Sequence, residues 1–141
     1  MFMILKKDIS IKLFVEDRIV HHLLYKYLYN LFDKSFIFDS YSCRLEKGTH
    51  KAVKRLEKFT RIVSKNYSRY CWALKLDIKK FFASVEHQVL LELLGKKVKD
   101  KDILKLLSEI INSFHSEQSL EKGIPLGNLT SQILVNIYMN E

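Results

Sequence analysis

Apolar side chains recur at intervals of three and four residues along much of this 141-residue chain, and this pattern constrains it to a helix-rich fold. Over residues 17–32 the spacing gives one apolar stripe, which predicts an amphipathic helix. A second helix is predicted over residues 49–65. We expect its apolar face to be buried, and that face carries Ala52, Val53, Leu56, Phe59 and Val63.

Residue types that favour helix starts predict three more helices. Ser84 and Asp100 are typical N-cap residues, and the helices after them are expected to run to about Leu94 and about Phe114. The chain's one proline lies in a predicted turn, KGIPLGN, over residues 122–128. A last helix follows this turn, with Asn128, Thr130 and Ser131 as possible caps and with Leu129, Ile133 and Ile137 on one face.

Two short segments instead alternate apolar and polar residues at a period of two, which is typical of β-strands. They are residues 9–15 (ISIKLFV) and residues 71–78 (CWALKLDI). The predicted order is strand, two helices, strand and three helices, which indicates an α+β fold: a helix-rich body with a small antiparallel sheet. Four glycines and one proline leave little room for a linker, and we expect a single domain.

The formal net charge of +8 is unevenly distributed along the chain. Residues 1–75 hold 16 Lys and Arg against seven Asp and Glu, a net of +9, whereas residues 76–141 hold eight against nine, a net of −1. All five arginines lie in the first half, among aromatic residues. A basic, aromatic surface suits a nucleic-acid backbone, but a solvated lysine-rich surface has the same composition. Charge alone does not decide between the two.

Neither the N-terminal segment nor the two cysteines indicate a membrane protein or an extracellular protein. The opening MFMILKK has five apolar residues before two lysines, which is too short for a signal-peptide core or a membrane span. Cys43 and Cys71 lie 28 residues apart without a CxxC pattern, and we expect two reduced thiols. The prediction is a cytoplasmic protein with no membrane partner.

Asp77 stands at the end of an otherwise apolar predicted strand and is followed by two lysines and two phenylalanines. Mg²⁺ prefers oxygen ligands and is commonly held by one or two carboxylates together with substrate phosphates. The Asp77 carboxylate is therefore a candidate metal ligand, and the carbonyl of Ile78 could serve a second ion. An exposed aspartate in a turn is the alternative that a single carboxylate leaves open.

Four segments of the chain, in order, resemble blocks of the bacterial group II intron-like reverse transcriptases. LKLDIKKFFASVEH resembles the first catalytic motif, in which an Asp closes a strand and an aromatic residue follows five positions on, here Asp77 and Phe82. GIPLGNLTSQILVNIYMNE resembles the next block, a Pro–x–Gly turn and helix that pack under the incoming nucleotide. EDRIVHHLLYKYL and FDSYSCRLEKGTHKAV resemble the fingers blocks. The four blocks together cover residues 16–141.

The resemblance implies the fingers and part of the palm of a right-hand polymerase, with about 1–70 as fingers and about 71–141 as palm with inserted fingers helices. It implies an RNA-directed DNA polymerase that uses an RNA template, a DNA or RNA primer, dNTPs and two Mg²⁺ ions. The family's Tyr–x–Asp–Asp strands and its thumb are not found in these residues. Since one carboxylate cannot hold two ions ~3.5–4 Å apart, we expect a fragment that is inactive alone.

The same resemblance assigns residue roles. Asp77 would ligate metal with help from the Ile78 carbonyl, and Phe82 would lie against the sugar as a steric gate, with core packing as its alternative. Arg18 occupies the position of the triphosphate-binding arginine, although a solvated helix-start arginine is the alternative. The lysine usual just ahead of that arginine is a glutamate here, and Lys12 is the candidate substitute.

Further contacts are implied for the turn block and for the basic half of the chain. Gly127 would let the backbone approach the nucleotide closely, unless it is only a turn glycine. The other predicted nucleotide-binding residues of this block are Pro125, Leu126 and Gln132. The predicted nucleic-acid-binding residues are Arg44, Lys47 and Lys51.

The turn block also carries a hint of subtype. Group II intron enzymes usually read Gln–Gly–x–x–x–Ser–Pro here, whereas this chain has Leu126 for the Gln and Gln132 for the Pro. This variant resembles reverse transcriptases of diversity-generating retroelements, which make errors at template adenines and work with a small helical accessory protein. Group II intron, retron and defence-associated enzymes remain alternatives, as does a catalytically inactive basic RNA-binding module.

Overall fold

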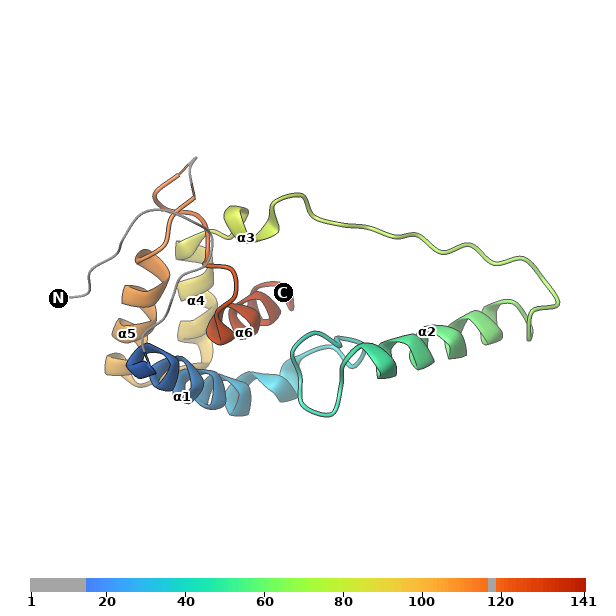
Figure 1. Ribbon diagram of the computed structural model, residues 1–141, viewed down its shortest axis with the longest axis horizontal. Helices are drawn as coiled ribbons and strands as arrows, with labels where there is room; N and C mark the ends of the chain where they lie inside the picture. Colours follow the sequence, from blue (N-terminus) through green and yellow to red (C-terminus); the bar gives the residue numbers. More distant parts are fainter. Residues whose placement is uncertain (1–14, 117–118) are drawn as a thin grey trace.

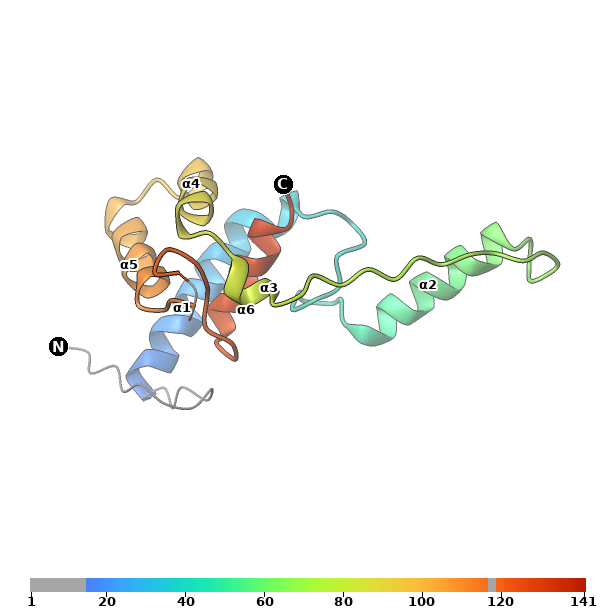
Figure 2. The same cartoon turned by 90° about the horizontal axis from the view of Figure 1, so that it is seen from above.

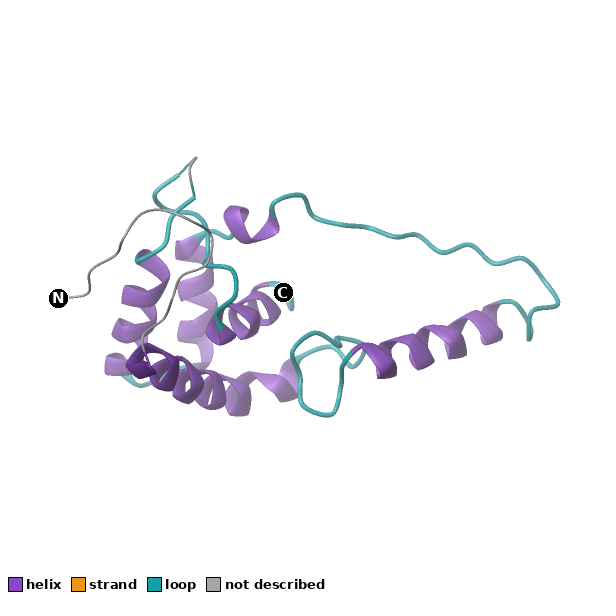
Figure 3. Cartoon of the chain, in the orientation of Figure 1, coloured by secondary structure: helices purple, strands orange, loops and turns teal. Residues whose placement is uncertain are grey.

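The computed structural model describes residues 15–116 and 119–141, and over these residues it consists of helices and loops without a strand (Figure 3). The helices are α1 (Val15–Phe32), the 3-10 helix η1 (Asp33–Ser35), α2 (Thr49–Val63), α3 (Phe81–Ser84), α4 (His87–Lys97), α5 (Lys101–Asn112) and α6 (Leu129–Tyr138). None of these helices combines the length and apolar character needed to cross a membrane.

The core lies among α1, α4, α5 and α6 (Figure 1). The most extensive contact joins α1 to α6, and α4 packs against both α5 and α6. Each of these helices contributes fully buried aliphatic side chains, among them Leu28, Leu94, Leu107 and Ile133. The apolar spacing that predicted a helix over residues 17–32, and the start signals that predicted three later helices, are confirmed by α1, α4, α5 and α6.

The helix α2 and the segment around residues 70–80 project away from this four-helix body (Figures 1 and 2). The helix itself was predicted correctly, but the expected burial of its apolar face is wrong. α2 has no buried residue, and Val53, Leu56 and Val63 are each at least 60% exposed. An amphipathic pattern fixes which face is apolar, but burial requires a partner, and the described residues place none against this face.

The predicted strand over residues 71–78 is extended but pairs with no neighbour in the described part of the chain. Its apolar side chains are open to solvent, with Trp72 97% exposed and Leu76 81% exposed. A strand needs a second strand to take up its backbone hydrogen bonds, so period-two alternation by itself does not make a sheet. Of the other predicted strand, residues 9–14 lie outside the described residues and Val15 begins α1.

Of the two predicted N-cap residues Asp100 and Ser84, one is confirmed and one is wrong. Asp100 is the N-cap of α5, and its Oδ1 accepts hydrogen bonds from the backbone N–H groups of Asp102 and Ile103 at 2.9 and 3.1 Å. Ser84 is not an N-cap. It ends the short helix α3, its hydroxyl donates to the carbonyl of Phe81, and α4 begins three residues later with Glu86 as its N-cap.

We expect Asp100→Ala to lower the free energy of unfolding by about 1 kcal/mol, because two N–H groups at the start of α5 lose their acceptor. Urea denaturation of the 141-residue chain measures this change. Asp102→Ala is the matched control: it removes a first-turn charge but no cap, and should cost roughly 0.5 kcal/mol or less. Equal losses for the two variants would contradict the assignment of Asp100 as the cap.

Candidate active site

Asp77 and Ile78 lie at the end of the exposed extended segment, just before the chain turns into α3. Lys80 makes this turn in the left-handed conformation, with φ of 53°. Both the Asp77 carboxylate and the Ile78 residue are exposed, so their oxygen atoms are open to an incoming ligand.

Phe82 follows in α3, half-buried against the edge of the core. Its ring meets that of Phe81 edge-on, with the ring centroids 6.1 Å apart, and Phe81 in turn contacts Tyr138 of α6. The predicted alternative of core packing therefore holds for part of this side chain. A smaller part of the side chain remains exposed and is available to a ligand.

The turn before α6 has a buried base and an exposed tip. Gly123, Ile124 and Pro125 are buried, whereas Leu126 is 53% exposed and Gly127 is exposed with φ of +90°. No atom would lie within 4 Å of a Cβ at Gly127, so space does not require glycine there, but its left-handed conformation favours glycine.

Backbone hydrogen bonds join this turn to the segment that follows Asp77. The N–H of Ile124 donates to the carbonyl of Phe82 at 2.9 Å, and the N–H of Gly123 donates to the carbonyl of Val85 at 2.8 Å. Glu86 and Lys122 form an isolated antiparallel bridge, and their side chains form an ion pair at 2.6 Å. The structure thus brings together Phe82 and the Pro–x–Gly turn, which lie about 40 residues apart in the sequence.

The helix α1 contacts the start of α6, directly after the turn. The Nδ1 atom of His21 lies 2.6 Å from the hydroxyl of Thr130 in the first turn of α6, and both residues are buried. Burial lowers the pKa of His21, and the nearby carboxylate of Asp17 offsets only part of this shift. Ser131 is buried beside Thr130, Gln132 is half-buried, and Arg18 is exposed one turn before His21.

Arg44 organises the loop between η1 and α2. Its guanidinium forms an ion pair with Asp33 at 2.7 Å and donates to the carbonyls of Ile37, Ser40 and Asp33, and its side chain is only 8% exposed. Partial burial by itself would raise the pKa of Asp33, but hydrogen bonds from Arg44 and Tyr29 outweigh it and lower that pKa. The nucleic-acid contact predicted for Arg44 stays a prediction, and its guanidinium already holds the loop.

Lys47 is held by contacts within its loop, whereas Lys51 is exposed on α2. The Lys47 ammonium donates to the carbonyl of Phe38 at 2.7 Å and lies 3.9 Å from the centroid of the Phe38 ring. Lys12, the candidate triphosphate ligand, lies outside the described residues.

Metal binding at Asp77 would need more ligands than this region supplies. The Asp77 carboxylate and Ile78 carbonyl are oxygen donors of the kind that Mg²⁺ prefers, so they fit part of such a site. Within residues 15–116 and 119–141, no group of three or more His, Cys, Asp and Glu side chains could hold a metal ion.

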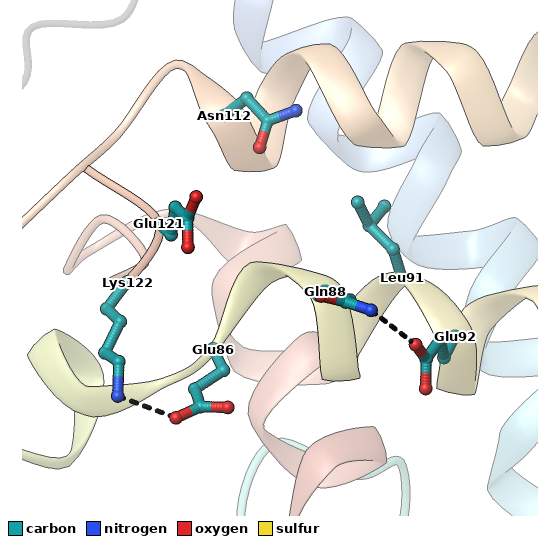
Figure 4. Close-up of a pocket in the computed structure, with 7 residues that line it drawn as sticks. All are labelled: Glu86, Gln88, Leu91, Glu92, Asn112, Glu121 and Lys122. Carbon is teal, nitrogen blue, oxygen red and sulfur yellow. Dashed lines mark hydrogen bonds and ion pairs between the residues drawn. The ribbon is translucent and has the colours of Figure 1, made fainter. Parts of the chain in front are cut away.

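A pocket lies elsewhere, between the start of α4, the end of α5 and residues Glu121 and Lys122 before the turn (Figure 4). It has a volume of about 630 Å³ and is lined by Glu86, Gln88, Leu91, Glu92, Asn112, Glu121 and Lys122. None of the predicted site residues lines it. Its position is therefore that of a surface hollow beside the turn, away from Asp77.

Two buried histidines had no role in the sequence-based prediction, although both bond to the turn block. His21 bonds to Thr130, and His87 bonds to Gly123. Their partners lie 109 and 36 residues away along the chain, so no local spacing signals these contacts.

Known proteins resemble this chain over nearly its whole length. Residues 4–141 match the family model described as reverse transcriptase (RNA-dependent DNA polymerase). The chain belongs to the reverse transcriptase family. Family membership implies a right-hand polymerase fold and the use of divalent metal ions, and the helix-rich character predicted from the sequence is confirmed. The small antiparallel sheet is not observed in the described residues.

Several curated relatives carry the same region. The chain is 29% identical over 134 residues to the putative COX1/OXI3 intron 2 protein of Saccharomyces cerevisiae, covering 89% of this chain and 14% of that protein. It is 25% identical over 131 residues to protein YkfC of Escherichia coli, covering 90% and 34%. It is 23% identical over 129 residues to the group II intron-encoded protein LtrA of Lactococcus lactis, covering 89% and 20%. The chain therefore spans between 14% and 34% of the length of these relatives.

We expect the unfolding free energy of this chain to fall as the pH drops through the ordinary histidine pKa of 6.5 toward the lower pKa of folded His21. The unfolded chain takes up this proton at a higher pH than the folded chain does, so stability rises with pH across that window. His21→Gln should flatten this dependence, as measured by urea denaturation between pH 5 and pH 8.

His22→Gln is the matched control, because His22 is the exposed neighbour on the same helix. It should leave the pH dependence unchanged. A His21→Gln variant with the full wild-type slope would show that burial of His21 is not its cause.

Proposed function

We propose that residues 1–141 supply the fingers (about 1–70) and the front of the palm (about 71–141) of an RNA-directed DNA polymerase. The polymerase copies an RNA template into cDNA from a DNA or RNA primer and dNTPs. The observation that carries the proposal is the hydrogen bond between Ile124 and Phe82, which holds the turn block against the segment that follows Asp77. These two segments are the ones that resemble the nucleotide-handling blocks of the family.

Each predicted residue has a chemical role in this proposal. Bound Mg²⁺ would supply electrostatic stabilisation of the transferring phosphoryl group. Asp77 would hold the metal together with carboxylates from other palm strands, and the Ile78 carbonyl would contribute one more oxygen. Arg18 would stabilise charge on the triphosphate, with Lys12 as a second cation.

The exposed face of Phe82 and the exposed tip of the turn would border the nucleotide. Phe82 would exclude a sugar that carries a 2′-hydroxyl. Gly127 would allow close approach of the backbone, while Pro125, Leu126 and Gln132 shape the surface under the base pair.

The projecting arm, α2 together with residues 70–78, fits this function. The extended segment 71–78 would pair with further palm strands in a small antiparallel sheet, which would cover its exposed apolar side chains. Lys51 would contact the backbone of template or primer, as would Lys47 and Arg44 where their loop contacts leave them free. A cytoplasmic location remains a prediction.

Two retroelement subtypes have support from different observations. Leu126 and Gln132 favour a diversity-generating retroelement enzyme, for which a small helical accessory protein would be a partner. The names of two relatives favour a group II intron enzyme instead, because the proteins from Saccharomyces cerevisiae and Lactococcus lactis are named for introns. Retron and defence-associated reverse transcriptases, and a basic RNA-binding module without catalysis, are the remaining alternatives.

Asp77→Asn in the complete polymerase should abolish primer extension on an RNA template with Mg²⁺ or Mn²⁺, because an amide is a much weaker metal ligand than a carboxylate. The circular-dichroism spectrum should not change, since Asp77 is exposed. Asp102→Asn is the matched control, as another exposed aspartate away from the turn block. Activity of Asp77→Asn within tenfold of wild type would rule out Asp77 as a metal ligand.

Leu126→Gln should reduce misincorporation by the complete polymerase, most visibly opposite template adenine, without a matching loss of rate. A Gln amide can form polar contacts near the nucleotide, and such contacts discriminate ~10⁴-fold or more, against ~10–200-fold for apolar contacts. Sequencing of cDNA made from one RNA template by both enzymes measures the change. Equal error spectra would show that Leu126 only packs, and would remove the residue-level support for the retroelement subtype.

A further inference from the structure

His87 is the first residue of α4 and is only 4% exposed. Its Nε2 atom lies 2.7 Å from the carbonyl oxygen of Gly123, at the base of the turn. A carbonyl can only accept a hydrogen bond, so Nε2 carries a hydrogen and donates it. The buried imidazole therefore directs Nε2–H at the turn.

The other side of the ring is tied to α5. Nδ1 of His87 lies 3.2 Å from Oδ1 of Asn112, and Nδ2 of Asn112 donates to the hydroxyl of Ser108 at 3.1 Å. Figure 4 shows Asn112 on α5 facing the segment that carries Glu121 and Lys122. The Nε2 contact orients the imidazole and its Nδ1 side faces Asn112, so the ring lies between a helix of the core and the turn.

The carbonyl that His87 holds belongs to a residue with little freedom. Gly123 has φ of +111°, and a Cβ there would lie 3.1 Å from both a ring carbon of Phe114 and the backbone N of Ser116. The N–H of Gly123 donates to Val85, and the N–H of the next residue, Ile124, donates to Phe82. His87 therefore completes the hydrogen bonding at the junction where the turn meets the Phe82 segment.

We propose that His87 is a positioning residue for nucleotide binding: it holds the Gly123 carbonyl and so sets the exposed tip, Leu126 and Gly127, relative to Phe82. This inference rests on the proposed function of the tip. The exposed tip lies between the buried base of the turn on one side and buried Asn128 at the start of α6 on the other, so the base is one of the two anchors that set where the tip lies. Loss of the His87 hydrogen bond loosens the base and moves both surfaces that border the nucleotide.

Three substitutions separate this role from ordinary core packing. His87→Gln places an amide N–H near the position of Nε2, so it can still donate to Gly123. His87→Asn ends near the position of Nδ1 and cannot reach that carbonyl. His87→Leu keeps the bulk but loses both polar contacts. If His87 only fills space in the core, the His87→Gln and His87→Asn variants should show the same amide exchange at the turn.

The first measurement is amide hydrogen exchange in the 141-residue chain, which does not depend on activity. In His87→Leu and His87→Asn we expect the amides of Gly123 and Ile124 to exchange roughly tenfold or more faster, because a buried carbonyl has lost its donor. In His87→Gln they should exchange within about threefold of wild type. The amides of Leu134 and Ile137 in α6 are the internal control and should keep their protection.

The second measurement is steady-state primer extension by the complete polymerase. His87→Asn should raise the KM for dNTP about tenfold or more with a smaller change in kcat, and His87→Gln should restore KM. A variant that is only less stable would lower the amount of active enzyme, and hence the apparent kcat, without this change in KM.

The two measurements fail in different ways. Wild-type enzyme without template-dependent synthesis would overturn the proposed function, and the exchange data would still decide whether His87 holds the turn. Unchanged protection of Gly123 and Ile124 in both His87→Leu and His87→Asn would overturn the positioning role. So would equal exchange or equal KM in His87→Gln and His87→Asn. If His87→Leu does not fold, the Gln–Asn pair carries the comparison.

Discussion

The hydrogen bonds between residues 82–87 and 121–124 are the contact on which the candidate site depends. They join the segment that follows Asp77 to the turn that precedes α6, although α4 and α5 lie between the two in the sequence. The backbone bonds are 2.8–3.0 Å long, and those at Gly123 and Ile124 lie at the buried base of the turn, where water competes less for them. The four-helix body holds α4 and α6 in place, and the two segments meet because both are attached to it.

The four-helix body is held together by buried contacts, whereas the projecting arm, α2 and residues 70–78, is not. In the body, α1 packs along α6 and the buried His21–Thr130 contact adds a polar link to aliphatic packing. In the arm, α2 and residues 70–78 expose apolar side chains such as Leu56 and Trp72. Isolated amphipathic helices and single strands gain little stability without a surface to pack on. The arm therefore carries apolar surface that the described four-helix body does not cover.

Arginine in the basic half has more than one use. The sequence places Arg44 in a charge-rich stretch that suits phosphate contacts, and its guanidinium instead lies mostly buried against Asp33 and three carbonyls. A planar group with five donors is well suited to such a loop. Lys51 on α2 is exposed and remains the clearer candidate for contact with a phosphate backbone.

The sequence by itself determined the helices of the body, the Asp100 cap, the turn at 122–128 and the family, because periodicity, capping chemistry and motif spacing are local properties. It did not determine whether α2 is buried or whether residues 71–78 pair, because both depend on partners supplied elsewhere. Only the tertiary structure brought Phe82 next to Ile124 and showed that Arg44 bonds within its own loop. It also identified the hydrogen-bond partners of His21 and His87. These contacts join residues far apart in the chain, and they form only once the helices have packed around a common core.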